Sequence, residues 1–114
     1  MVDVEAAFLN AHVDTEVYIE MPEGLKQYYQ KSKGIDLGDS IIKLDRAQCG
    51  LVQSPRLWMA TFSKILTRLG LKQCKTDPCL FSLHDDKGNL LALVMVYCDD
   101  SIITGFRNHV SRLK

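Results

Sequence analysis

The residues best suited to chemistry in this chain are the adjacent carboxylates Asp99 and Asp100, which closely follow the hydrophobic run Leu90 to Val96. A β-branched run, Ser101 to Thr104, comes next, so the pattern predicts a tight hairpin with Cys98 to Asp100 at its tip. A divalent cation between two such carboxylates offsets their repulsion, and hard oxygen ligands suit Mg²⁺ or Mn²⁺. A polar turn explains the same Asp pair equally well, because Asp is a common turn residue.

A third carboxylate, Asp3, lies near the start of the chain, within the short apolar alternation Met1 to Val4. The segment that follows, Glu5 to Asn10, has helical propensity, so we expect a strand that runs into a short helix. At such a junction an Asp is commonly an N-cap that accepts hydrogen bonds from the first helical N–H groups. From its position alone, Asp3 is as good a candidate for a cap as for a metal ligand.

Short apolar runs predict the strands that position these carboxylates, namely Val17–Met21, Ser40–Leu44, Cys79–Leu83 and Leu90–Tyr97. The last run has almost no polar alternation, which is typical of a strand that is central in its sheet or covered on both faces. The link 85–89 between the last two runs is a hairpin turn. The mostly polar segment 25–39 predicts a loop, and the basic tail 105–114 resembles the start of a further element.

The clearest helix begins with Ser54 as a suitable N-cap and Pro55 at the first helical position, and Gly70 provides a left-handed stop. Its apolar side chains recur on one stripe, made of Trp58, Phe62, Ile65, Leu66 and Leu69. The simplest partner for this stripe is the sheet of neighbouring strands. The predicted fold class is therefore α+β, an antiparallel sheet packed against helices.

The composition is that of one small globular domain, with 114 residues of which 46% are hydrophobic. Fourteen basic and fourteen acidic side chains cancel, so there is no overall positive field to hold a nucleic-acid backbone. The four cysteines lack zinc-site spacing, and we expect reduced thiols. No signal peptide and no apolar run of roughly 20 residues is present, so we expect an intracellular protein, cytoplasmic or nuclear, neither secreted nor in a membrane.

Several blocks follow one another in a telling order: Asp3-Val4 with Ala7-Phe8-Leu9-Asn10, Glu16-Val17-Tyr18 with Met21-Pro22-Glu23-Gly24, Gly50-Leu51 with Gln53-Ser54-Pro55-Arg56 and Trp58, Asp77 to Phe81, and Tyr97-Cys98-Asp99-Asp100. This succession resembles the reverse transcriptase of copia-type retrotransposons, and the blocks with the segments between them span nearly the whole chain. A single block is weak evidence, but blocks in order are specific. The resemblance implies an RNA-directed DNA polymerase with a palm-like fold.

The resemblance also assigns roles to residues. Asp3, Asp99 and Asp100 would be the catalytic metal ligands of a site with two Mg²⁺ or Mn²⁺ ions, and we expect their carboxylates to cluster in space. The nucleotide site would include Phe8, Cys49, Gln53 and Tyr97, with Phe8 as the bulky residue that excludes a 2′-hydroxyl. The implied partners are an RNA or DNA template-primer and deoxynucleoside triphosphates.

Departures from the family pattern limit what is expected of the chain alone. Cys49 stands where the family usually has Tyr, and Val52 stands where it usually has Lys, which removes a cation near phosphates. Residues 1–114 correspond to a partial domain, the palm core with part of the fingers, without thumb, RNase H or integrase. We therefore expect an incomplete palm that is inactive alone and that can self-associate through exposed palm surfaces. The alternative is a non-catalytic retrotransposon remnant that acts as a partner-binding domain.

Overall fold

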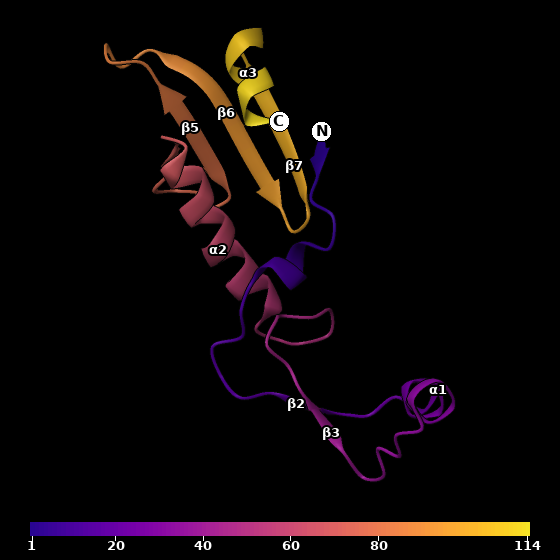
Figure 1. Cartoon of the computed structure of the whole chain (residues 1–114). Coiled ribbons are helices and arrows are strands. Elements are labelled where there is room, and N and C mark those ends of the chain that lie inside the picture. Colours follow the sequence, from indigo (N-terminus) through magenta and orange to yellow (C-terminus); the bar gives the residue numbers. More distant parts are fainter.

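The structure, a computed structural model, describes residues 1–114 (Figure 1). The elements are β1 (Val2–Asp3), the 3₁₀ helix η1 (Ala7–Asn10), β2 (Tyr18–Glu20), α1 (Glu23–Lys33), β3 (Ile41–Lys43), α2 (Ser54–Arg68), β4 (Lys72–Gln73), β5 (Leu80–His84), β6 (Leu90–Tyr97), β7 (Asp100–Gly105) and α3 (Arg107–Leu113). Five strands form one antiparallel sheet in the order β1-β7-β6-β5-β4, and β2 pairs with β3 in a small separate sheet. The predicted α+β class, with an antiparallel sheet packed against helices, is confirmed.

Strand β6 lies at the centre of the five-stranded sheet, as its apolar run predicts. Its side chains alternate between the two faces, so that Ala92, Val94 and Val96 are buried whereas Met95 and Tyr97 are exposed. The interpretation that β6 is covered on both faces is therefore wrong. Only one face of the sheet is covered, and the other is uncovered.

Helix α2 packs on the covered face, where Leu66 joins a cluster with Phe81, Val94 and Val96. The helix is followed by Leu69 as its C-cap and then by Gly70 at φ 91°, the predicted left-handed stop. Two residues of the predicted stripe, Ile65 and Leu69, are exposed. A helix that packs against one surface buries a narrow stripe, and these two side chains lie outside it.

The N-terminal end of α2 differs from the prediction as well. Ser54 is the first helical residue rather than the N-cap, and the N-cap residue Gln53 makes no side-chain capping hydrogen bond. The Ser54 hydroxyl instead donates a hydrogen bond to the Gln48 carbonyl oxygen, 2.6 Å away. The loop before the helix is thereby tied to the first turn, which explains why a serine is buried there.

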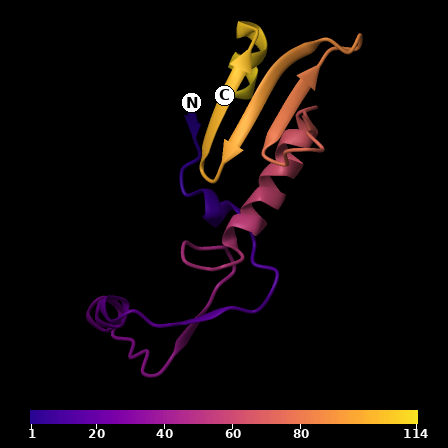
Figure 2. The ribbon, with the colours of Figure 1, turned by 180° about the vertical axis from the view of Figure 1, so that it is seen from behind.

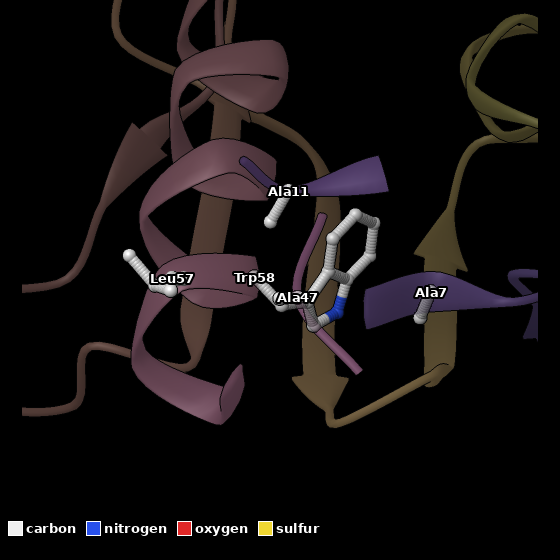
Figure 3. Packing of buried hydrophobic residues seen from close by; sticks show 5 residues of the cluster. All are labelled: Ala7, Ala11, Ala47, Leu57 and Trp58. Carbon is white, nitrogen blue, oxygen red and sulfur yellow. The ribbon is translucent and has the colours of Figure 1, made fainter. Parts of the chain in front are cut away.

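A second apolar cluster surrounds Trp58 at this end of α2. Figure 3 shows the indole between the helix and the segments that carry three alanines, Ala7, Ala11 and Ala47. The small alanine side chains leave room for the large ring, which is 2% exposed. Trp58 also stacks on Phe62, with ring centroids 5.0 Å apart. The cluster joins the start of the chain, the loop before α2 and the helix itself.

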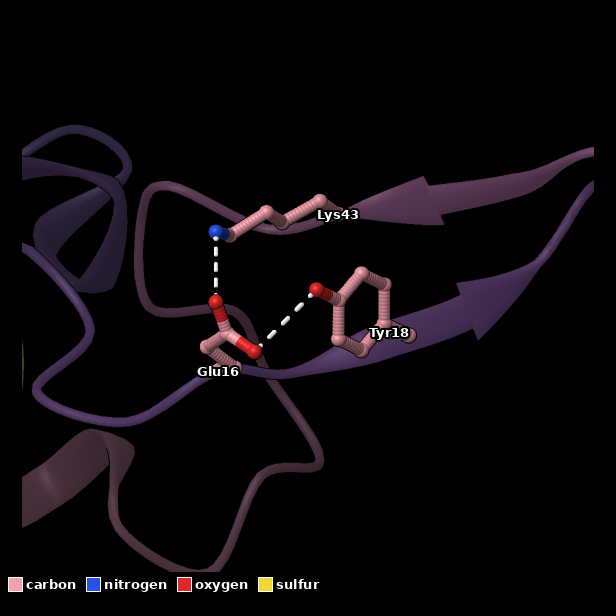
Figure 4. Close-up of polar contacts among 3 residues, drawn as sticks. All are labelled: Glu16, Tyr18 and Lys43. Carbon is pink, nitrogen blue, oxygen red and sulfur yellow. Dashed lines mark hydrogen bonds and ion pairs between the residues drawn. The ribbon is translucent and has the colours of Figure 1, made fainter.

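Strands β2 and β3 and helix α1 form an arm that extends away from the sheet, as both ribbon views show (Figures 1 and 2). The chain measures 63 × 26 × 18 Å, and its radius of gyration is 19.4 Å, against roughly 13 Å for a compact domain of this length. At the base of the arm, Glu16 accepts hydrogen bonds from Lys43 (3.0 Å) and from the Tyr18 hydroxyl (3.2 Å) (Figure 4). Backbone pairing of β2 with β3 joins the two strands of the arm, and α1 buries no residue.

The predicted loop over 25–39 is wrong for most of its length, because residues 23–33 form α1. The end signals of a helix were present: Glu23 lies in the first turn, Lys31 and Lys33 lie in the last turn, and Gly34 follows at φ 64°. The segment reads as a loop because most of its residues are polar, and its short apolar spacing, Leu25 with Tyr28 and Tyr29, is easily overlooked. The basic tail forms α3, whose Leu113 packs against the cluster under the sheet. None of the helices is both long and apolar enough to span a membrane.

Candidate active site

Three aspartates from opposite ends of the chain meet at one end of the large sheet. Tyr97 and Asp100 are paired across β6 and β7 and close a two-residue turn made of Cys98 and Asp99. Strand β1 pairs with β7 so that Asp3 lies directly opposite Asp100. The Val4 N–H then donates a hydrogen bond of 2.9 Å to the Asp99 carbonyl oxygen. The predicted hairpin tip is confirmed, and the fold brings the backbones of all three aspartates together.

The strand register also sets the face on which two of these carboxylates lie. Directly opposite residues of an antiparallel pair project to the same face, so Asp3, Asp100 and Tyr97 belong to the uncovered face of the sheet. All three aspartates are exposed. Their carboxylates do not converge, however: no three His, Cys, Asp or Glu side chains form a group that could hold a metal ion. The strand register places the backbones side by side, but the expected cluster of three carboxylates is not formed in this structure.

Asp99 lies in the hairpin turn that the polar-turn interpretation expects, but the carboxylates of the three aspartates make no structural hydrogen bond. The N-cap of η1 is Ala6, and no side chain caps this helix, so the capping interpretation of Asp3 is wrong. Carboxylates that accept hydrogen bonds in this structure belong to Asp14, Glu16, Asp36, Asp77 and Asp85. The carboxylates of Asp3, Asp99 and Asp100 are absent from this set.

The other hairpin of the sheet provides an internal comparison. In the turn between β5 and β6, Asp85 accepts hydrogen bonds from the backbone N–H groups of Lys87 (2.9 Å) and Asn89 (2.8 Å). The Asn89 side chain also donates to Asp85 and lowers the pKa of its carboxyl. This is how an aspartate stabilises a turn. Asp99 and Asp100 do nothing of the kind, so their carboxylates are free for a ligand.

The turn that carries Asp99 is fastened to the helix behind it. The Trp58 indole N–H donates a 2.6 Å hydrogen bond to the Cys98 carbonyl oxygen. Cys98 has a φ of 53°, a left-handed conformation that is uncommon for a residue other than glycine. On the neighbouring strand, the Ser101 hydroxyl donates to the Val2 carbonyl oxygen at 3.1 Å and holds β1 against β7. Two side-chain hydrogen bonds therefore position the aspartate-bearing segments.

A cavity of about 570 Å³ lies beside this turn. Its lining is mostly apolar and consists of Ala6, Ala7, Phe8, Leu9, Gln48, Cys49, Cys98 and Asp99. Two of the four residues expected at a nucleotide site, Phe8 and Cys49, thus share a cavity with Asp99. Gln53 and Tyr97 do not line it, and Tyr97 is 79% exposed on the strand before the turn.

The sequence reasoning did not assign five of the cavity residues to a nucleotide site, namely Ala6, Ala7, Leu9, Gln48 and Cys98. One of them, Ala6, has a φ of 50°, a left-handed conformation that no pattern in the sequence announces. Residues held in such conformations cluster at functional sites, where the surrounding structure enforces them. Here the two left-handed residues other than glycine, Ala6 and Cys98, both line the same cavity.

Comparison with known proteins agrees with this geometry. Residues 1–112 match the family described as "Reverse transcriptase (RNA-dependent DNA polymerase)". The chain is 30% identical over 103 residues to the retrovirus-related Pol polyprotein from transposon TNT 1-94 of Nicotiana tabacum, and 34% and 33% identical over 103 residues to those from transposons RE2 and RE1 of Arabidopsis thaliana.

Each alignment covers 90% of this chain but only 7% of the Nicotiana polyprotein and 6% of the two from Arabidopsis. No solved structure matches the chain. The family match covers almost every residue, and the relatives are Pol polyproteins of transposons, in agreement with the resemblance found in the sequence blocks. The chain belongs to the reverse transcriptase (RNA-dependent DNA polymerase) family, in its copia-type retrotransposon branch.

Proposed function

We propose that the end of the sheet at the β6–β7 turn is the nucleotidyl-transfer centre of an RNA-directed DNA polymerase, in a palm-like fold. In this proposal Asp3, Asp99 and Asp100 bind Mg²⁺ or Mn²⁺, and the cavity beside them takes the incoming deoxynucleoside triphosphate. The observation that carries the proposal is the strand register, which pairs Asp3 with Asp100 and bonds Val4 to Asp99.

The donor set fits a hard divalent cation by its chemistry. It consists of three exposed carboxylates on adjacent segments, and none is engaged in another interaction. Convergence requires rotation of these side chains about their Cα–Cβ bonds, which their exposure permits. Two bound divalent ions would supply activation of the primer 3′-hydroxyl and neutralisation of the leaving pyrophosphate.

The other residues of the site bind and orient. Phe8 presents an aromatic ring to the cavity that Asp99 also lines, which suits a surface under the sugar of the nucleotide. Trp58 holds the turn through the Cys98 carbonyl oxygen, so the position of Asp99 is set by the packed helix α2 rather than by a free loop. Selection of the base would come from pairing with the template of a bound template-primer.

The chain spans a small part of its polyprotein relatives, and its acidic and basic side chains are equal in number. With no net positive charge it is not expected to grip a template-primer tightly by itself. We therefore expect metal and nucleotide binding from this chain, and extension of a primer only as part of a larger assembly.

Manganese binding tests the proposal directly. Trp58 is the single tryptophan of the chain, and its indole touches the turn that carries Asp99, so paramagnetic Mn²⁺ bound there should quench its fluorescence. We expect the quenching to weaken strongly in Asp100→Asn and Asp3→Asn. Asp86→Asn, which changes an exposed aspartate in the other hairpin turn, is the matched control and should quench like the wild type.

Equal quenching in Asp100→Asn and in the unchanged chain would refute the metal assignment. Primer extension on an RNA template with Mg²⁺ is the complementary test. Extension that persists in the Asp99→Asn, Asp100→Asn double variant would show that other residues carry the chemistry.

Self-association is a second candidate property, and the uncovered sheet face favours it. Met95 (49% exposed) lies directly opposite Ile102 (55% exposed), so two apolar side chains form a cross-strand pair in solvent. Apolar patches of this kind favour association. Sedimentation of the chain and of the Met95→Lys, Ile102→Lys variant tests this, and we expect a smaller species for the variant. Identical monomers in both samples would rule association through this face out.

A further inference from the structure

Two of the four cysteines, Cys49 and Cys98, lie in the candidate active site, and the proposed chemistry uses neither. Both are free and exposed, and both line the cavity that Phe8 and Asp99 also line. The remaining two, Cys74 and Cys79, flank the connection from β4 to β5, are partly buried and do not line this cavity. The chain therefore has one pair of accessible thiols at a single cavity that is partly open to solvent, and a second pair elsewhere that can serve as a comparison.

Helix α2 holds the backbone next to both cavity thiols. The Ser54 hydroxyl bonds the carbonyl oxygen of Gln48, the residue before Cys49, at 2.6 Å. One helical turn further on, the Trp58 indole bonds the carbonyl oxygen of Cys98, also at 2.6 Å. Residues four apart on a helix share a face and have Cβ atoms about 5–6 Å apart. Because both cysteine-bearing loops are fastened to this short stretch of one helix, the two thiols are kept at a common cavity.

We propose that this cavity is a thiol-modification site, in which Cys49 or Cys98 reacts with a small disulfide of the glutathione class. The thiolate sulfur attacks one sulfur of the small disulfide, a protein–S–S–R bond forms and the R–S–S–R bond breaks. The departing thiolate takes up a proton, which balances the proton lost by the protein thiol. The products are a mixed disulfide on the chain and one free small thiol.

The size and lining of the cavity determine the consequence of this reaction. A volume of about 570 Å³ lies in the range of roughly 300–1,000 Å³ that holds one small-molecule ligand. A glutathionyl group on either thiol would take up much of that space, so a second group on the other thiol would have to compete for the same room. If, as proposed above, the same cavity takes the nucleotide, modification would block nucleotide binding. This regulatory consequence, unlike the thiol site itself, rests on the proposed function.

The first experiment needs no nucleotide. A chain with Cys74→Ser and Cys79→Ser keeps only the cavity thiols and is treated with excess oxidised glutathione, and intact mass counts the adducts. We expect one adduct per chain, or its resolution product, a Cys49–Cys98 disulfide, since both outcomes require a shared space. Adding Cys49→Ser or Cys98→Ser should leave a chain that still accepts one adduct. Two adducts on the chain that keeps both cavity thiols, or neither an adduct nor a Cys49–Cys98 disulfide, would overturn the proposal.

Peptide mapping of the unchanged chain gives the same count without any substitution and covers the case in which a serine variant fails to fold. There, doubly modified molecules with adducts on both Cys49 and Cys98 would overturn the proposal. Adducts on Cys74 do not bear on it, because this thiol lies outside the cavity.

The second experiment separates the thiol site from the proposed function. Binding of a fluorescent deoxynucleoside triphosphate with Mn²⁺ is measured before and after modification of the Cys74→Ser, Cys79→Ser chain. We expect binding about tenfold or more weaker after modification, since the adduct fills the cavity. The same treatment of a Cys49→Ser, Cys98→Ser chain should leave nucleotide binding unchanged. If the unmodified chain binds no nucleotide, the proposed function fails, while the adduct count still decides the thiol site.

Discussion

The hydrogen bond from Trp58 to the Cys98 carbonyl oxygen is the contact whose loss should most clearly connect packing with the site. Trp58→Phe keeps an aromatic ring on α2 that can still stack on Phe62, but it removes the indole N–H that bonds the Cys98 carbonyl oxygen. The substitution therefore separates the tether from the aromatic packing. We expect a less stable chain in which the β6–β7 turn opens more easily.

The expected cost follows from two contributions. The hydrogen bond contributes about 1 kcal/mol net, and because Cys98 is exposed, water can replace the donor, so no larger desolvation penalty applies. The indole is 2% exposed among small alanine side chains, and the smaller phenyl ring leaves a gap that costs roughly 1–2 kcal/mol. Together, Trp58→Phe should lower the free energy of unfolding by about 2–3 kcal/mol.

Urea unfolding followed by circular dichroism measures this loss without the tryptophan signal. Amide hydrogen exchange reports on the turn itself, through the Val4 N–H that donates to the Asp99 carbonyl oxygen. A local loss of about 2 kcal/mol corresponds to exchange on the order of thirtyfold faster. Thr61→Val is the matched control, because the Thr61 hydroxyl bonds only the Leu57 carbonyl oxygen of its own helix.

The control should change the free energy of unfolding by less than about 0.5 kcal/mol. If Trp58→Phe changes stability no more than this control does, and exchange at Val4 is unchanged, then the tether does not hold the turn. The argument that α2 positions Asp99 would then be refuted.

Three further predictions concern other parts of the chain. A Cβ on Gly105, which has a φ of 148°, would lie 2.7 Å from the Ala92 Cα, so Gly105→Ala should lower the free energy of unfolding by urea by about 3 kcal/mol. Gly24→Ala in α1 is the control, because a Cβ there has no atom within 4 Å, and its effect should be neutral or slightly stabilising. Equal losses of stability in the two variants would contradict the predicted clash at Gly105. The Arg56 side chain donates a hydrogen bond of 2.7 Å to the Asp14 carboxylate and lowers the pKa of that carboxyl, so the stability that this pair contributes is present above the ordinary pKa of Asp and is lost as the pH falls through the lowered pKa. In Arg56→Gln the pKa of Asp14, followed by NMR titration, should rise. An unchanged pKa would show that Arg56 does not cause the lowered value. The Thr76 hydroxyl lies 3.2 Å from the Cys74 sulfur and lowers the pKa of that thiol, so Thr76→Val should slow the alkylation of Cys74 near pH 8 and leave the alkylation of Cys79 unaffected. An unchanged rate at Cys74 would show that the Thr76 hydroxyl does not lower its pKa.

The course of the elements along the chain was largely predictable from local patterns. Pro55 and Gly70 bracket α2, and the apolar run before Tyr97 predicts the central strand, because these signals act within a few residues. Helix α1 was missed for the opposite reason. It buries no residue and is mostly polar, so its apolar period is short, limited to Leu25, Tyr28 and Tyr29, and its end signals at Glu23 and Gly34 were the other indications of a helix.

The site was predictable in part. The Asp pair at a hairpin tip is a local pattern, and the ordered blocks indicated the family and the importance of Asp3. Which aspartates are free was not predictable, because Asp85 and Asp99 both occupy hairpin turns, and only Asp85 has hydrogen-bond partners in place. Tyr97 and Gln53 were expected at the nucleotide site and lie outside the cavity, since the strand register and the start of α2 turn them elsewhere.

By itself, then, the sequence determined the family, the strand and helix content around the hairpin, and the three aspartates as candidates, since each depends on residue types over short spans. The tertiary structure alone decided that Asp3 lies opposite Asp100, that Trp58 fastens the turn, and that Cys49 and Cys98 share a cavity with Phe8. These relations join residues far apart along the chain. They depend on strand register and on how the alanine-lined cluster packs around the indole, and neither is encoded by the period of any single segment.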